Sequence, residues 1–194
     1  MSASAANKPR RATQADLEAV PPHRVAEILN GELVVSPRPA PRHRQAASAL
    51  GGLLIGPFRF GHGGGPGGWV ILDEPELHFG PKTDSDVLVP DIAGWRRERM
   101  PEIPDEAAIT VAPDWCCEVL SRSTETHDRG TKMPIYAREQ VKHLWLVDPI
   151  AQTLEVYRLK ADGWLLLATH TRNSKVRAEP FEAIELELEL LWAR

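Results

Sequence analysis

Residues 112–149 read APDWCCEVLSRSTETHDRGTKMPIYAREQVKHLWLVDP. The stretch begins with an apolar run that carries Glu118 and continues through a polar loop into a helical segment that carries Lys132. It ends in a second apolar run, residues 141–147, which closes on Asp148-Pro149. Apolar runs of this length, bounded by turn residues, are typical of buried strands. The stretch therefore predicts a β-α-β unit, and we expect the rest of the chain to be arranged around it.

Glu118 interrupts an apolar strand, and a buried carboxylate without a partner costs several kcal/mol or shifts its pKa. A second acid, Asp91, lies inside another β-prone run, VLVPDIAGW, at residues 87–95. Each acid must either be satisfied inside the protein or face a cleft. The pair therefore predicts one shared site.

A chain of 194 residues is long enough for one domain with a proper core and leaves little for a second. We expect residues 1–13, which are small, polar and basic, to form a disordered tail and residues 14–194 to form the single domain. No apolar run approaches the roughly 18 residues that span a bilayer, and the first residues lack the order of a secretory signal. The only cysteines, Cys116 and Cys117, are adjacent and cannot form an ordinary disulfide with each other. These features predict a cytoplasmic protein without a membrane partner.

The formal net charge of −4 excludes a protein that coats nucleic acid with a globally basic surface. Binding to nucleic acid would need a local patch, and arginines cluster in three places near the proposed motifs. The clusters are Arg38, Arg42 and Arg44; Arg96, Arg97 and Arg99; and Arg122 and Arg129. Each cluster can equally be solvated surface. We choose Arg122, Arg129 and Arg42 as the expected nucleic-acid contacts, because the first two flank the loop after Glu118.

The first half of the chain contains a hairpin signal and a helix signal. Two β-prone runs, residues 25–29 and 32–35, flank Asn30-Gly31, the strongest short hairpin signal in a sequence. Residues 41–55 predict a helix, because their apolar side chains form one stripe. The stripe consists of Ala46, Ala47, Leu50, Leu53 and Leu54. The glycine-rich residues 61–68 lack a Gly-Lys-Ser/Thr and precede a strand, so we interpret them as a loop and not as a phosphate-binding site.

The remaining strands are predicted from β-prone runs. Residues 69–79 and 87–95 each predict one strand, and we expect the two to pair antiparallel. Residues 152–159 and 163–169 predict a hairpin near the C-terminus. Residues 182–190 alternate Glu with apolar residues, which predicts an edge strand with its carboxylates in water.

Four segments form a set: Pro90-Asp91, EVLS at residues 118–121, Lys132 with Tyr136, and LWLVDP at residues 144–149. As a set, they resemble the Uma2 family of endonucleases, within the PD-(D/E)XK nuclease superfamily. The resemblance covers roughly residues 25–157. It implies an α/β fold with a restriction-endonuclease-like αβββαβ core, a central mixed sheet, an N-terminal β-hairpin and a C-terminal β extension.

The resemblance also implies a role for the lysine. The superfamily usually has a lysine two residues after the second acid, and this chain has Leu120 there. We assign the role to Lys132 on the following helix, and we expect its side chain to face an open cleft with little burial. Lys142 is the reserve candidate.

Further site residues follow from the same resemblance. The N-terminal hairpin would bring Glu27 or Glu32 near the site, and the family has a histidine at the position of His43. From the residues alone, both glutamates can equally be exposed hairpin acids, and His43 can equally be a surface or capping residue.

Asp91, Glu118 and the carbonyl of Val119 supply the hard oxygen ligands that Mg²⁺ or Mn²⁺ prefers. The expected function is a metal-dependent endonuclease that hydrolyses DNA, with Lys132 at the phosphate or the attacking water. One alternative is a nuclease-like fold that binds nucleic acid or a protein without cutting. A second is a structural network in which the two acids pair with arginines. A homodimer is left open. A Ser-His-Asp hydrolase is disfavoured, because Ser121 and Ser123 lack nucleophile-elbow glycines.

Overall fold

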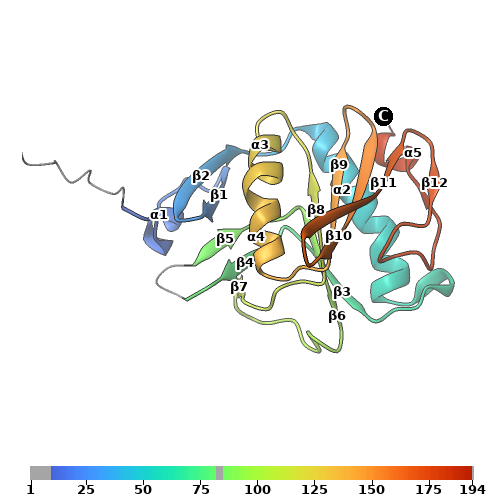
Figure 1. Cartoon of the computed structure of the whole chain (residues 1–194), viewed down its shortest axis with the longest axis horizontal. Helices are drawn as coiled ribbons and strands as arrows, with labels where there is room; N and C mark the ends of the chain where they lie inside the picture. The colour runs from blue at the N-terminus through green and yellow to red at the C-terminus, as the bar shows by residue number, and fades with distance from the viewer. Residues whose placement is uncertain (1–9, 82–84, 194) are drawn as a thin grey trace, which may run out of the picture.

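A computed structural model describes residues 10–81 and 85–193 of the protein. The N-terminal hairpin lies at one end of the molecule and the C-terminal segment at the other, with the largest sheet between them (Figure 1). The predicted α/β fold with a central mixed sheet is confirmed. The order α2-β3-β6-β8-α4-β9 along the chain corresponds to the expected αβββαβ core.

The larger sheet has six strands in the order β11-β10-β9-β8-β6-β3. Its strands are β3 (Trp69–Asp73), β6 (Ile92–Arg96), β8 (Trp115–Val119), β9 (His143–Asp148), β10 (Thr153–Lys160) and β11 (Gly163–Thr171). β8 and β9 are parallel, and the other neighbours are antiparallel. Because parallel neighbours need a crossover, residues 120–142 cross the sheet as a helical connection, which confirms the predicted β-α-β unit.

The smaller sheet has five strands in the order β2-β1-β5-β4-β7. Its strands are β1 (Arg24–Leu29), β2 (Glu32–Pro37), β4 (Glu76–Phe79), β5 (Asp86–Leu88) and β7 (Ala108–Ile109). The predicted hairpin is confirmed: Leu29 pairs with Glu32, and Asn30 and Gly31 have positive φ angles of 53° and 85°. Two consecutive positive φ angles are what a two-residue hairpin turn requires.

The prediction of two long paired strands at residues 69–79 and 87–95 is wrong in one respect. Each run breaks in the middle, so that β3 pairs with β6 in the larger sheet and β4 pairs with β5 in the smaller one. Glu74 has a φ of 44° before Pro75, and Pro90 lacks the N–H that a continuous ladder needs. The breaks leave Asp91 at the corner where the chain passes from one sheet to the other.

Helices cover the two faces of the larger sheet. α2 (Pro41–Leu54) packs on one face, where Ala46, Leu50 and Leu54 are fully buried as the predicted stripe requires. The opposite face is covered by a helical segment that includes α3 (Glu125–His127), a π-helical turn (Asp128–Lys132) and α4 (Met133–Arg138). Alternation along β8 places Cys117 in the first core and Cys116 in the second.

Short helical turns occur outside the elements named above. α1 is Gln14–Glu18, a π-helical turn at Ile55–Arg59 follows α2, and the glycine-rich loop contains a 3₁₀ turn at His62–Gly64 before β3 begins. The predicted loop at residues 61–68 is thus confirmed. No helix within the described residues is long and apolar enough to cross a bilayer.

The predicted tail is only partly described, since residues 1–9 lie outside the described residues. The next residues contact the domain: the Thr13 side chain caps α1, and the backbone N–H of Ala12 donates to the carbonyl of Gly31 at 2.7 Å. The described fold therefore begins before residue 14.

The predicted edge strand at residues 182–190 is wrong over most of its length. The segment contains β13 (Leu186–Glu187), which pairs with β12 (Lys175–Val176), and then turns into α5 (Glu189–Trp192). Leu186, Leu188 and Leu191 are buried. A change from strand to helix between Leu188 and Leu191 keeps both leucines on the core side, because residues three apart share a helical face.

The C-terminal segment is anchored by Phe181. Its ring lies 4.6 Å from the ring of Phe58, 4.8 Å from Trp69, 4.9 Å from Trp115 and 5.6 Å from Trp145, measured between ring centroids. We expect Phe181→Ala to lower the free energy of unfolding by about 3–5 kcal/mol, because it leaves a cavity among these rings. Urea denaturation measures the loss. Phe60→Ala is the matched control: Phe60 is 58% exposed, and its loss should cost less than about 0.5 kcal/mol. Equal losses in the two variants would contradict this account of the core.

Candidate active site

Asp91 ties the ends of two central strands together. It follows Pro90 at the corner between the sheets, and its Oδ2 atom accepts a hydrogen bond from the N–H of Val119 at 2.7 Å. β6, which begins immediately after Asp91, pairs Ile92 with Cys117 on β8. The carboxylate therefore lies at the ends of β6 and β8 that also carry Glu118.

Glu118 faces the helical crossover. Alternation along β8 directs its side chain toward α4, where it is 3% exposed. Its Oε1 atom accepts a hydrogen bond from the hydroxyl of Tyr136 and lies 2.7 Å from Nζ of Lys132. Leu120, at the superfamily's usual lysine position, is buried in the core on the same side of the sheet.

Lys132 lies at the centre of the acidic side chains. It ends the π-helical turn before α4, and its Nζ atom lies 3.0 Å from Oε1 of Glu27 and 3.8 Å from Oδ1 of Asp128. The same atom donates to the carbonyl of Val89 at 3.3 Å. Lys132 is 2% exposed, so the expectation of an open cleft with little burial is wrong. Because the chain bulges at the π turn, a residue of the crossover helix can approach the strand acid; such turns occur frequently at functional sites.

Of the two hairpin acids, Glu27 joins the site and Glu32 does not. Glu27 lies within β1, is 7% exposed and accepts a hydrogen bond from the N–H of Val89 at 2.8 Å. Glu32 is exposed beside the turn of the hairpin. β1 pairs with β5 through Ile28 and Val87, and this register directs Glu27 toward the corner that contains Asp91.

His43 reaches the site from the first turn of α2. It is 7% exposed, and its Nε2 atom lies 3.4 Å from Oδ1 of Asp91. Burial alone would lower the pKa of the ring. The hydrogen bond to Asp91, that carboxylate's charge, a hydrogen bond to the backbone of Val119 and the charge of Asp128 outweigh burial, so the pKa of His43 is raised.

Acidic groups outnumber basic groups in the site. Four carboxylates surround one ammonium group and one imidazole: Glu27, Asp91, Glu118, Asp128, Lys132 and His43. Burial opposes the charged form of Lys132, yet the surrounding carboxylates raise its pKa well above the ordinary value. Burial also raises the pKa of Glu118 well above its ordinary value, since one shared lysine does not offset both burial and the neighbouring acids. The same causes raise the pKa of Asp128. The site therefore holds more acidic groups than basic ones, and burial disfavours the charged form of two of the four acids.

Two residues of the site were not predicted from the sequence. Asp128 is 3% exposed and lies beside Lys132. Tyr136 is fully buried and donates to Glu118. Asp128, Lys132 and Tyr136 are spaced by four residues, which places them on one face of a helix. That spacing was the available signal.

Six residues of the site line a small cavity of about 50 Å³: Glu27, His43, Asp91, Glu118, Asp128 and Lys132. Within residues 10–81 and 85–193, no group of three or more His, Cys, Asp or Glu side chains is arranged to hold a metal ion. Two acids on one cavity still match the donor set of Mg²⁺, which takes one or two protein carboxylates and keeps several waters. Asp91 and Glu118 fit that requirement.

The arginines chosen from the sequence differ in their surroundings. Arg129 forms a two-pronged ion pair with Glu155, with N–O distances of 2.7 and 2.9 Å, and also contacts Glu125, so its guanidinium is already paired. Arg122 and Arg42 are exposed and line a cavity that begins beside His43.

Two other groups of basic residues lie away from the acids. The cluster of Arg96, Arg97 and Arg99 follows the end of β6 opposite to Asp91. Lys142 precedes β9 at the level of Trp115, which is the end of β8 opposite to Val119. This position removes Lys142 as a replacement for Lys132.

Comparisons with known proteins agree with the described fold. The model of the Uma2 family, described as "Putative restriction endonuclease", matches residues 14–190. Among solved structures, one described as "a putative nuclease belonging to DUF820" from Anabaena variabilis ATCC 29413 is similar, with a TM-score of 0.69 and 21% sequence identity. The similarity covers 94% of this chain and 98% of that chain, and it shows a shared fold. No curated protein shows significant similarity to the chain.

The family match extends over all the elements that form the site. It includes the hairpin with Glu27, the start of α2 with His43, both strand acids and Lys132. The chain therefore belongs to the Uma2 family.

Proposed function

We propose that the protein is a Mg²⁺- or Mn²⁺-dependent endonuclease that hydrolyses phosphodiester bonds of DNA. The observation that carries the proposal is the meeting of Asp91, Glu118 and Lys132, from three separate elements, on one small cavity. Membership of a family described as "Putative restriction endonuclease" supports the same class of reaction.

In this proposal Asp91 and Glu118 hold the metal ion, with the backbone carbonyl of Val119 as an additional oxygen ligand. When bound, the ion would neutralise charge on the phosphate and lower the pKa of a water molecule. The number of buried carboxyl groups supports this assignment, because a divalent cation would favour their charged form and reduce the repulsion between them.

Hydrolysis forms a bond between a water oxygen and phosphorus and breaks one bridging P–O bond. Negative charge grows on the phosphoryl oxygens during this step, and fixed cations stabilise it most effectively in a site that excludes water. Lys132 can supply a fixed positive charge, since its ammonium is held by Glu118, Glu27 and Asp128. His43 would orient Asp91 through the contact with its Oδ1 atom.

The two alternatives make different demands on the site. A structural network of acids with arginines is not supported: within the described residues, the cationic neighbour of Glu118 and Glu27 is Lys132, and that of Asp91 is His43. A module that binds without cutting requires no lysine next to the strand acid. The position of Lys132 therefore favours the enzyme.

Mn²⁺ should stabilise the protein against heat. At a concentration about 100 times Kd, binding contributes about 2.7 kcal/mol and should raise Tm by roughly 5–10 °C. Asp91→Asn should abolish this rise, because the amide can still accept the hydrogen bond of Val119 but no longer carries charge. Asp162→Asn, in the exposed turn between β10 and β11, is the control and should respond like the wild type. Thermal melts with and without Mn²⁺ provide the test, and an Asp91→Asn protein with the wild-type response would contradict the ligand assignment.

Lys132→Ala should reduce cleavage by about a hundredfold or more, as the loss of one preorganised electrostatic contact does. It should also lower the free energy of unfolding by about 3–5 kcal/mol, because the buried carboxylates lose their shared cation. Lys132→Arg should restore little activity, since the planar guanidinium does not replace a compact ammonium.

Cleavage of the Lys132 variants is measured well below their Tm and normalised to the folded fraction by circular dichroism. This separates catalysis from stability. Wild-type rates per folded molecule in Lys132→Ala would remove this lysine from the reaction.

The salt dependence of DNA binding separates the two loop arginines. Arg122→Ala should reduce the slope of log affinity against log salt concentration by about one, because an exposed guanidinium that contacts a phosphate is lost. Arg129→Ala should leave the slope unchanged and lower Tm, since it breaks the pair with Glu155. Fluorescence anisotropy over a range of salt concentrations measures both slopes. A reduced slope for Arg129→Ala and an unchanged one for Arg122→Ala would reverse the assignment.

A further inference from the structure

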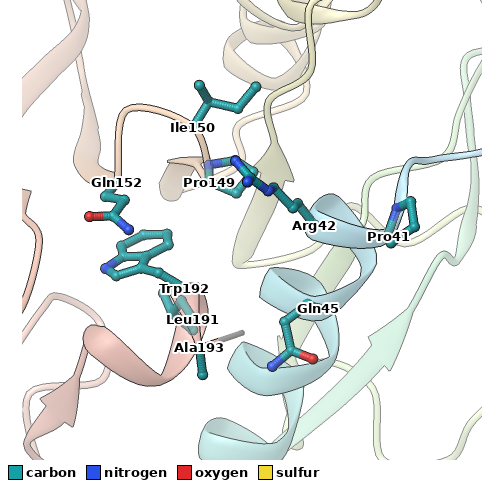
Figure 2. A pocket seen from close by; sticks show the side chains of 9 residues that line it. All are labelled: Pro41, Arg42, Gln45, Pro149, Ile150, Gln152, Leu191, Trp192 and Ala193. Carbon is teal, nitrogen blue, oxygen red and sulfur yellow. The ribbon is translucent and has the colours of Figure 1, made fainter.

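Two large cavities continue from the small acidic cavity along the surface. The first, of about 640 Å³, lies between the start of α2 and residues 120–124, and it shares His43 and Thr124 with the acidic cavity. The second, of about 400 Å³, lies between α2, the β9–β10 turn and α5 (Figure 2). Both are lined by Pro41, Arg42, Pro149 and Ile150. We call the two together the Arg42 groove; it leads from the acids to Trp192.

The lining of the Arg42 groove combines positive charge with apolar surface. Its arginines are Arg38, Arg42 and Arg122, and no Asp or Glu is among the described residues that line it. Within residues 10–81 and 85–193, the side chains of Arg42 and Arg122 make no hydrogen bond or ion pair, which leaves both guanidinium groups available. The protein as a whole carries a net charge of −4, so this groove stands out as a local attraction for an anion.

The apolar part of the groove matches the faces of nucleobases. Ile150 is 59% exposed at the boundary between the cavities, and the indole of Trp192 forms part of the wall at the far end. In Figure 2, Arg42 extends from α2 toward Pro149, while Gln45 and Gln152 lie on the two sides of the cavity. Single-stranded nucleic acid is bound by this combination: aromatic side chains stack on bases, cations contact the backbone, and amides read base edges.

A duplex does not match the groove equally well. In a duplex the bases stay stacked inside the helix, and the protein meets phosphates and groove edges, so the apolar walls would have no partner. Each cavity has the size of sites that enclose a small-molecule-sized group, such as one nucleoside. An unpaired strand can place successive bases in the two cavities and its phosphates beside the arginines.

We propose that the Arg42 groove binds an unpaired strand of nucleic acid that continues from the scissile phosphate, so that the substrate is single-stranded or carries a single-stranded branch. The position of the scissile phosphate rests on the proposed nuclease function, whereas binding of the strand to the groove does not. The two can therefore be tested separately.

The test compares a fluorescein-labelled oligothymidylate with a duplex of the same length by fluorescence anisotropy, in EDTA so that no cleavage occurs. We expect the wild type to bind the single strand at least about tenfold more tightly than the duplex. Trp192→Ala should weaken binding of the single strand by about tenfold, as the loss of one stacking side chain does. Arg42→Ala should weaken it several-fold and reduce its salt slope by about 0.7.

Two matched variants serve as controls. Trp164 and Trp192 are both half-buried, and each donates its indole N–H to one backbone carbonyl. The acceptor is Met133 for Trp164 and Arg172 for Trp192. Arg97, like Arg42, is exposed, but it follows the end of β6 opposite to Asp91. Trp164→Ala and Arg97→Ala should bind the single strand with wild-type affinity. Because Arg42 is exposed, its variant remains informative even if Trp192→Ala destabilises the fold.

Several results would overturn the groove proposal: tighter or equal binding of the duplex, no binding of either DNA, or an equal loss in the groove variants and their controls. Cleavage is assayed separately with Mn²⁺. If the wild type binds the single strand through the groove but cuts no DNA, the groove proposal stands and the nuclease proposal fails. If it cuts DNA while the groove variants bind and cut like the wild type, the groove proposal fails alone.

Discussion

The ammonium of Lys132 is shared by Glu27, Glu118 and Asp128, and this shared charge joins three parts of the fold. Glu27 comes from the N-terminal hairpin, Glu118 from the central strand and Asp128 from the crossover helix. Without a cation between them, these carboxylates would repel one another in a space where charge is poorly screened. The pairing therefore holds the hairpin and the helix against the sheet, in addition to any part in the reaction.

The same site depends on an interruption of the backbone. If β5 and β6 formed one continuous strand, Asp91 would be an ordinary residue within that strand. The chain would then not pass from the smaller sheet to the larger one at this point. Pro90 breaks the ladder, and the carboxylate of Asp91 replaces part of it by accepting the N–H of Val119. The cost of the break is thus partly offset by a hydrogen bond to a charged group, which is stronger than one between neutral groups.

The sequence was sufficient where local patterns determine structure. Asn30-Gly31 predicted the hairpin, apolar runs around Glu118 predicted the β-α-β unit, and the two strand acids predicted a shared cavity. Features that depend on residues far apart in the sequence could not be predicted from local patterns. The register of β1 with β5 places Glu27, and not Glu32, in the site. Arg129 forms an ion pair with Glu155, a residue of β10. The alternating tail was ambiguous because leucines at positions 186, 188 and 191 can be buried by a strand that changes into a helix. The burial of Lys132 depends on a π turn, for which we have no sequence signal.

Charge is separated along the surface that the proposed substrate would follow. Carboxylates dominate the small cavity, whereas arginines and apolar side chains line the groove beside it. A phosphate is attracted to the groove but repelled by the acids, so an anionic strand can be held along the groove without its backbone entering the small cavity. Entry then requires a charge of the opposite sign at the acids, and Lys132 is already engaged by three of them. Under the two proposals, binding of the strand and cleavage are separate requirements: the groove would provide affinity without a metal ion, and the acids would make the reaction depend on one.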